Sequence, residues 1–182
     1  MPSDLQVDNI KDGSATKTLA EYSSSAWSWG TPPSNTIIQV VSENFESTTT
    51  ATDTNEVASF LTKDITSSKA NSKFLVMVNS MTGGEDATPI VILRRTISSS
   101  AFDIETSGGI TATSDARLVN VRHGTNLHLS YVDSPSQAAS TTINYKIILK
   151  SLDTNDVYLG KSGFSAGAGT CLSSITIMEL AV

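Results

Sequence analysis

The side chains of this sequence that are best suited to chemistry are two histidines, His123 and His128. His123 stands beside a glycine at a predicted turn, and His128 projects from the polar side of a predicted strand. A zinc site needs three or four ligands, and no cysteine or carboxylate spacing supplies the others. We therefore expect both histidines to be ordinary surface residues, with no metal site and no cofactor.

Carboxylates are the next candidates, because a pair of them can serve as the acid and base of a glycosidase. The available residues are Asp86, Glu105, Asp115 and Asp133, and the sequence alone gives no separation between them. Asp133 precedes Ser-Pro, which is typical of a turn whose carboxylate accepts a backbone N–H. Serine is abundant, yet no Gly-x-Ser-x-Gly motif is present to mark a nucleophile. We expect no catalytic residues.

Glycine pairs and the single cysteine also favour structural roles. Gly83-Gly84 and Gly108-Gly109 are followed by neither a helix nor a lysine, so we interpret them as turn glycines and not as a phosphate cradle. Cys171 is the one cysteine, which excludes an intrachain disulfide and a thiolate metal site. Because it precedes an apolar strand, we expect it to be a small buried hydrophobe.

Strands must position these side chains, because helical patterns are almost absent. The chain holds 28 serines and 23 threonines, and threonine suits a half-exposed sheet whereas serine suits the turns between strands. One weak helix candidate, residues 18–22, is too short to stand alone. Apolar runs and period-two alternation predict about nine strands, at residues 36–41, 56–66, 73–78, 89–97, 117–122, 126–132, 142–152, 157–159 and 172–182.

The spacing of these strands predicts the fold class. Strands at intervals of roughly 8 to 15 residues, without helical crossovers, favour an all-β jelly-roll β-sandwich over other sandwiches. The strand at 172–182 runs to the last residue given, so we expect it to lie inside its sheet. Residues 82–87 are predicted to form an exposed hairpin loop, and residues 163–170 a surface loop.

An extended N-terminal arm is predicted ahead of the sandwich, because residues 1–34 carry few apolar side chains and no sustained period. The sandwich domain is predicted at residues 35–182. Residues 4–10 alternate like a short edge strand that adds to a partner's sheet. Trp27 and Trp29 would expose large apolar area in a free arm, so they either fold back onto the sandwich or dock into another chain.

Charge is sparse, at 16% of the residues, and the net charge is −6. Phosphate-backbone binding needs clustered lysine and arginine, and the one adjacent basic pair, Arg94-Arg95, lies in a predicted strand, so we expect no nucleic-acid partner. No apolar run approaches the ~20 residues that span a bilayer, and no basic segment with a following apolar stretch marks a signal peptide. We expect no membrane insertion, and synthesis in a cytoplasm.

The arm at residues 5–30 resembles the start of many virion proteins from marine tailed bacteriophages. The segments at 38–41, 72–76, 133–136 and 174–179 resemble the same proteins and follow in the same order. Proteins of this type are fibre, spike or capsid-decorating components and are generally trimeric. The strand order is also similar to that of the trimeric jelly rolls of the tumour-necrosis-factor and complement-C1q type.

The resemblance implies a homotrimer that is made in the host cytoplasm and located in the virion. Its partners would be other virion proteins, of the capsid or the tail, and a glycan of the host surface. The particle-anchoring residues would be Leu5, Val7, Ile10, Trp27 and Trp29. The trimer contacts would be Phe74, Val76 and Val78, within the nearly continuous apolar run at 73–78. The outward loop would be Gly83, Gly84, Glu85 and Asp86.

Two other functions stay open. A free carbohydrate-binding β-sandwich module would need exposed aromatic rings on its loops. The candidates are Phe102, Tyr131, Tyr158 and Phe164, with Tyr131 expected to face the core. A polysaccharide-cleaving enzyme, as some phage spikes are, would need clustered carboxylates, which this sequence does not show.

Overall fold

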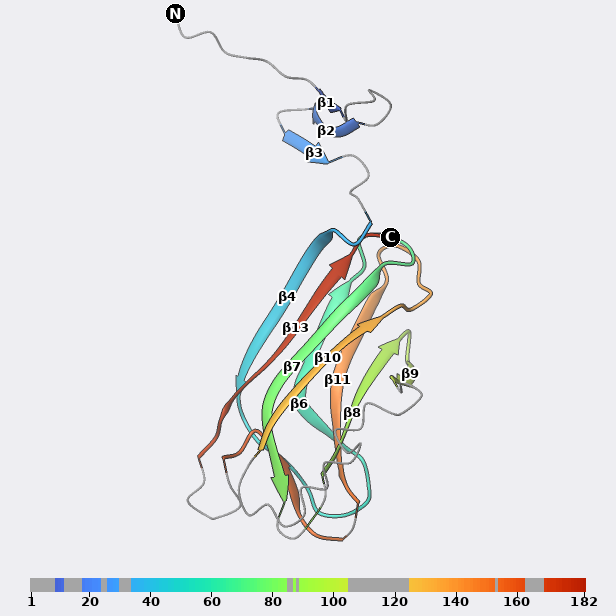
Figure 1. Cartoon of the computed structure of the whole chain (residues 1–182). Helices are drawn as coiled ribbons and strands as arrows, with labels where there is room; N and C mark the ends of the chain where they lie inside the picture. Colours follow the sequence, from blue (N-terminus) through green and yellow to red (C-terminus); the bar gives the residue numbers. More distant parts are fainter. Residues whose placement is uncertain are drawn as a thin grey trace, which may run out of the picture.

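The protein is all-β in the computed structural model, which describes residues 9–11, 18–23, 26–29, 34–84, 87, 89–104, 125–152, 154–162 and 169–182 (Figure 1). Its strands are β1 (Asn9–Lys11), β2 (Thr18–Ser23), β3 (Ala26–Trp29), β4 (Ile37–Glu46), β5 (Thr49–Ala51), β6 (Val57–Thr66), β7 (Lys73–Gly84), β8 (Pro89–Ile97), β9 (Ser100–Asp103), β10 (Thr125–Asp133), β11 (Thr142–Ser151), β12 (Val157–Leu159) and β13 (Leu172–Leu180). None of the described residues forms a helix long and apolar enough to span a bilayer.

Two antiparallel sheets form the sandwich. One contains β4, β13, β7 and β10 side by side, and the short strands β12 and β5 extend it beyond the end of β13. The other has the order β6-β11-β8-β9. The long strands of the two sheets run in similar directions, as Figure 1 shows. Strand β13 therefore lies between β4 and β7, which confirms the prediction that the last strand is inside its sheet.

The strand order is that of a jelly roll. The eight main strands, in chain order, are β4, β6, β7, β8, β9, β10, β11 and β13. Counted in this order, the first sheet holds the first, eighth, third and sixth strands, and the second sheet holds the second, seventh, fourth and fifth. Successive strands thus cross between the sheets several times, as two Greek keys require. The predicted fold class, an all-β sandwich with jelly-roll order, is confirmed.

The core fills the space between the two sheets with alternate side chains of each strand. In β7 these are Phe74, Val76 and Val78, all with no exposed surface. In β11 they are Ile143, Tyr145, Ile147 and Leu149, likewise without exposed surface. Full burial of each such side chain contributes about 2 kcal/mol of transfer free energy, so the period-two pattern holds the two sheets together.

Most predicted strands lie within a few residues of the observed ones. The strand predicted at 89–97 coincides with β8, and that at 73–78 continues in the structure to Gly84, into the loop predicted at 82–87. The weak helix candidate at 18–22 is wrong, because these residues form β2, which pairs with β1 and β3. The strand predicted at 117–122 and most of the loop at 163–170 lie outside the described residues.

Candidate functional site

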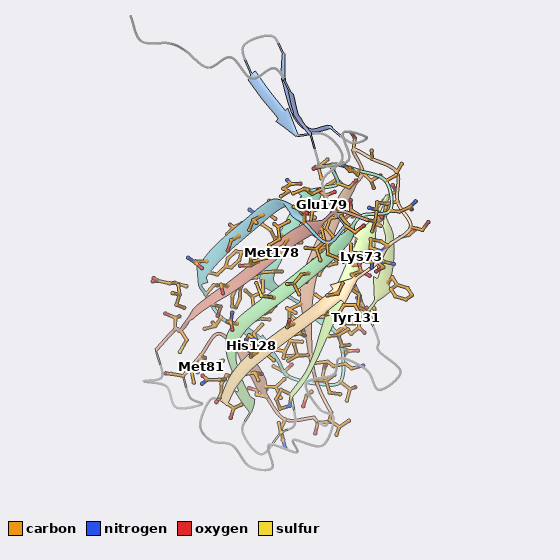
Figure 2. The ribbon with its side chains drawn as sticks, turned by 45° about the horizontal axis from the view of Figure 1, so that its top comes forward. Lys73, Met81, His128, Tyr131, Met178 and Glu179 are labelled. Atoms are coloured by element: carbon orange, nitrogen blue, oxygen red, sulfur yellow. The ribbon has the colours of Figure 1, made fainter. Side chains whose placement is uncertain are left out.

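One outer face of the sandwich is almost free of charge. The outward residues of β7 alternate with its core residues and include Leu75, Met77 and Asn79. Cross-strand register aligns each of them with one outward residue of β13, one of β10 and, through β13, one of β4. Each such set forms a layer that runs across four strands. Figure 2 views the molecule from this side, with Met178, His128 and Met81 on the strands in the foreground.

Each layer has its own chemistry. The first layer is apolar and consists of Val40, Met178, Leu75 and Val132. The second is mostly hydroxyl and consists of Ser42, Thr176, Met77 and Ser130. The third is amide and hydroxyl with one imidazole and consists of Asn44, Ser174, Asn79 and His128. We call these twelve residues the uncharged face.

Solvent reaches much of the uncharged face. Val40 and Val132, at the two edges of the apolar layer, are 53% and 46% exposed, and the central Leu75 and Met178 are half-buried between their neighbours. Charged side chains stand only at its ends among the described residues, with Lys73 beyond the apolar layer and Glu46 beyond the amide layer. Within the face, Ser42 Oγ lies 2.8 Å from Thr176 Oγ1, and His128 Nδ1 lies 2.6 Å from Asn79 Oδ1.

The opposite outer face, on the β6-β11-β8-β9 sheet, differs sharply in charge. Arg94 of β8 donates to the Asp103 carboxylate from both Nε and Nη2, and to Glu56 Oε2 at 2.8 Å. The Arg94 guanidinium holds the pKa of the Asp103 carboxyl below its ordinary value. Lys146 and Lys150 project from β11 on the same side. Among the described residues, charged side chains are thus more frequent on this outer face than on the uncharged face.

A polar cluster lies within the sandwich around Asp133, which is 5% exposed. Arg95 Nη1 donates to both carboxylate oxygens, at 2.7 and 2.9 Å, and the Tyr145 hydroxyl donates to Oδ2 at 2.7 Å. Burial, together with the neighbouring carboxylate, raises the pKa of Tyr145. Asp133 pairs with both Arg95 and Tyr145, so this cluster stabilises the fold and presents no free acid or base. The predicted backbone partner of Asp133 is replaced by these side chains.

A second buried carboxylate, Glu179 of β13, has no exposed surface. Its Oε1 accepts the Ser68 N–H at 2.8 Å and the Lys69 N–H at 3.2 Å, and Oε2 accepts the Ser68 N–H at 3.0 Å. Oriented to satisfy both of its amide atoms, Gln39 donates to Oε2 at 3.0 Å. Glu179 therefore fixes the turn between β6 and β7 and, like Asp133, has a structural role.

The described surface offers a polar hollow of about 240 Å³ at the β4 and β6 edges. Its lining groups satisfy one another, because Lys63 Nζ pairs with Glu43 Oε2 at 2.8 Å and Asn144 Nδ2 donates to Asp64 and Thr62. Among the described residues no three His, Cys, Asp or Glu side chains gather in a group that could hold a metal ion. This hollow therefore provides no reactive centre.

The structure places the predicted trimer contacts in the core of the single chain. Phe74, Val76 and Val78 have no exposed surface, so a contact between copies through β7 would use the alternate residues Leu75 and Met77.

The described residues of the predicted outward loop are less exposed to solvent than expected. Gly83 and Gly84 are buried at the end of β7, where they pair with Tyr158 and Val157 of β12. The close approach of the Tyr158 ring explains the glycine at 83, because a Cβ there would lie 2.6 Å from the Tyr158 hydroxyl oxygen. Glu85 and Asp86 lie outside the described residues.

The predicted anchoring residues fall in the N-terminal part. Ile10 belongs to β1, and Trp27 and Trp29 belong to β3. Among the described residues, β3 pairs only with β2. Leu5 and Val7 lie outside the described residues, and anchoring to a particle stays a prediction.

The remaining candidate residues are two histidines, one cysteine and four aromatic residues, and those that the structure describes differ in their exposure. His128 lies on the exposed side of β10, as predicted, and His123 is outside the described residues. Cys171 is only half-buried, with Sγ 3.2 Å from Met81 Sδ. Among the aromatic candidates for sugar stacking, Tyr158 is 2% exposed, Tyr131 packs against the core as expected, and Phe102 is 56% exposed. Phe164 lies outside the described residues.

The fold and this surface define a jelly-roll β-sandwich with one uncharged outer face. Among solved structures, the chain is similar to the infectious bursal disease virus VP2 subviral particle, with 8% identity and a TM-score of 0.37 over 85% of this chain and 43% of that chain. It is similar to infectious bursal disease virus of the Gx strain, with 6% identity and a TM-score of 0.36 over 91% of this chain and 44% of that chain.

A third similar structure is dimeric latent PorU from Porphyromonas gingivalis, with 9% identity and a TM-score of 0.33 over 81% of this chain and 13% of that chain. The chain spans less than half the length of each of these proteins. No family model and no curated protein matches the sequence. At these identities and TM-scores the likenesses carry no argument about function.

Proposed function

We propose that this chain is a non-enzymatic structural protein of a virion, a homotrimeric fibre, spike or capsid-decoration component. The observation that carries the proposal is the uncharged face, an apolar and hydroxyl surface on a chain of net charge −6. The cores of protein interfaces are depleted of charged residues in the same way. The sequence resemblance supplies the virion context.

The positions of the chain ends support an arrangement with the arm toward the particle. Asn35, just before β4, donates its N–H to the Ala181 carbonyl at 2.7 Å, and the Ala181 N–H donates to Thr36 at 2.9 Å. The entry of residues 1–34 and the end of β13 thus lie at one end of the sandwich, while β4 ends at Glu46 and β7 at Gly84 at the other (Figure 1). The second end would face outward, toward a host surface and its glycans.

The first test is the oligomeric state of the full chain in solution. Light scattering should give three times the mass of the 19.2 kDa chain. A monodisperse monomer at micromolar concentration contradicts the proposal.

The second test is incorporation into particles. The full chain should be found in purified virus particles from its native host, and Trp27→Ala/Trp29→Ala should be depleted from particles while remaining trimeric. Phe102→Ala, which changes an exposed ring on β9, is the matched control and should incorporate normally. Absence of the unaltered chain from particles contradicts the virion role.

A further inference from the structure

The layers of the uncharged face differ along the strands and are uniform across them. Moving along β7 from Leu75 to Asn79, the face changes from apolar to hydroxyl to amide. Moving across from β4 to β10, the apolar layer stays apolar, from Val40 at one edge to Val132 at the other. This one-directional order restricts how two such faces can pack together.

Two directions of packing must be compared. If a second copy is turned end over end, its amide layer lies opposite the first copy's apolar layer, which buries Asn79 and His128 against Leu75 and Val132 without partners. If the second copy is related by a rotation axis parallel to the strands, each layer meets its own kind. Apolar side chains then pack together, and serine and asparagine side chains, which both donate and accept, bond to one another.

We propose that copies of this chain pack side by side through the uncharged face, around a symmetry axis parallel to the strands. The occupant of the face is thus another copy in the same orientation. This packing proposal deepens the proposed function, and it takes the number of copies, three, from that function. A cyclic arrangement of this kind brings every arm to the same end of the assembly, which is the end of the sandwich where Asn35 meets Ala181.

The lack of charge on the face fits a second copy. A chain with net charge −6 repels its own kind except where a surface lacks charge, and the three layers contain no Asp, Glu, Lys or Arg. Four strands about 4.8 Å apart and three layers about 6.8 Å apart cover about 390 Å² as a flat area. Two such faces bury about 780 Å² together, the size of a small and weak interface, so the absence of charge is the argument for a second copy.

Disulfide trapping in the full chain tests the orientation. In a Cys171→Ser background, Val40→Cys/Val132→Cys places two cysteines in the apolar layer, on exposed residues at opposite edges of the sheet. Three strand spacings, about 14 Å, separate these positions within one chain. That distance is beyond the reach of a disulfide, so any crosslink joins different copies. Under mild oxidation this variant should form covalent multimers in high yield.

The matched control is Val40→Cys/Asn126→Cys in the same background, because Asn126 is exposed on β10 and three layers away from Val132. The two cysteines of neighbouring copies then lie about 20 Å apart along the axis, and crosslinking should fall at least tenfold. More efficient crosslinking of the control than of Val40→Cys/Val132→Cys overturns the proposal, since it places different layers of the two copies opposite each other. An oligomer that persists while neither variant crosslinks also overturns it.

A charge variant tests the packing surface separately from the proposed trimeric function. Val40→Glu/Val132→Glu alters two exposed positions of the face, and Ala58→Glu/Leu152→Glu alters two exposed apolar positions elsewhere. By sedimentation velocity the first should be monomeric and the second unchanged, with equal circular dichroism. A trimer that survives Val40→Glu/Val132→Glu overturns the face proposal and leaves the trimeric function standing. Covalent dimers without trimers support the face and contradict the trimer.

Discussion

Arg95 of β8 and Asp133 of β10 form an ion pair that joins the two sheets of the sandwich, because β8 and β10 belong to different sheets. Arg94, the preceding residue, directs its guanidinium to the outer face, where it binds Asp103 and Glu56. The alternation of a strand thus sends two adjacent arginines to opposite sides of one sheet. The guanidinium carbon of Arg95 also lies 4.9 Å from the centre of the Phe102 ring.

Asp133→Asn should destabilise the protein by about 3 kcal/mol, because it leaves the Arg95 charge largely buried and unpaired. Urea unfolding of the full chain measures the loss. Asp64→Asn, at an exposed position on β6, is the matched control and should change the free energy of unfolding by less than about 0.5 kcal/mol. Equal effects of the two substitutions would show that the ion pair adds nothing.

Protonation of Asp103 should lower the free energy of unfolding in acid. Its pKa is lowered in the folded state, chiefly by the hydrogen bond from Arg94, and lies near 3.9 when unfolded. A lowered pKa contributes stability that is present above about pH 4 and is lost as the pH falls through the folded value. Asp103→Asn and Arg94→Gln should each flatten the fall of unfolding free energy between about pH 4 and 2. Slopes identical to that of the unaltered chain would contradict this assignment.

Glu179→Gln should lower the free energy of unfolding by about 2 kcal/mol, because charge-assisted hydrogen bonds to the Ser68 and Lys69 amides are weakened. Hydrogen exchange at these two amides should accelerate. Glu46→Gln, at an exposed position of β4, should leave both measurements unchanged. Unaltered exchange at Ser68 in Glu179→Gln is the result that counts against the anchoring role.

Gly160→Ala should destabilise by at least about 1 kcal/mol, because alanine is strained at positive φ. Gly160 has φ of 79°, and a Cβ would lie 2.1 Å from the Ser47 carbonyl oxygen. Gly169→Ala is the matched control, since nothing lies within 4 Å of its added Cβ. Thermal unfolding of both variants decides the matter, and a lower Tm for Gly169→Ala than for Gly160→Ala would reverse the conclusion.

Ser98→Asn/Ser99→Gly should stabilise the protein by about 1 kcal/mol. Ser98 and Ser99 form a two-residue loop between the paired Ile97 and Ser100, with φ of 46° and 70°. Positive φ at both positions defines a type I′ turn, which Asn-Gly fits best. The Tm should rise by a few degrees, and a fall would show that the serine hydroxyls stabilise the turn.

Strand positions were largely predictable, because burial of one face imposes the alternation that the sequence displays. Strand β9 was missed, since Ser-Ala-Phe-Asp shows no apolar period and is held by pairing with β8. The apolar run at 73–78 predicted trimer contacts through Phe74, Val76 and Val78. The structure separates its two sets of side chains, with Phe74 in the core and Leu75 half-buried on the uncharged face.

The polar clusters and the uncharged face could not be predicted from local pattern. Asp133 meets Arg95 across 38 residues of sequence, and Glu179 meets Ser68 across 111. The apolar layer joins residues from four strands whose neighbours are set by the jelly-roll order, so Val40 and Val132 share a layer only once the order β4-β13-β7-β10 is known. Contacts of this kind depend on topology, which short sequence windows do not contain.

The bonding of β4 to β13 also determines how the sandwich bears mechanical load. Tension applied through residues 1–34 along the strand direction enters at Asn35 and passes directly into β4, which runs antiparallel to β13. Such a pull acts on the whole β4–β13 ladder in shear, so its hydrogen bonds resist together and do not open one after another. The β4–β13 ladder should therefore resist a pull along its strands better than a sideways force that peels β4 from the sheet.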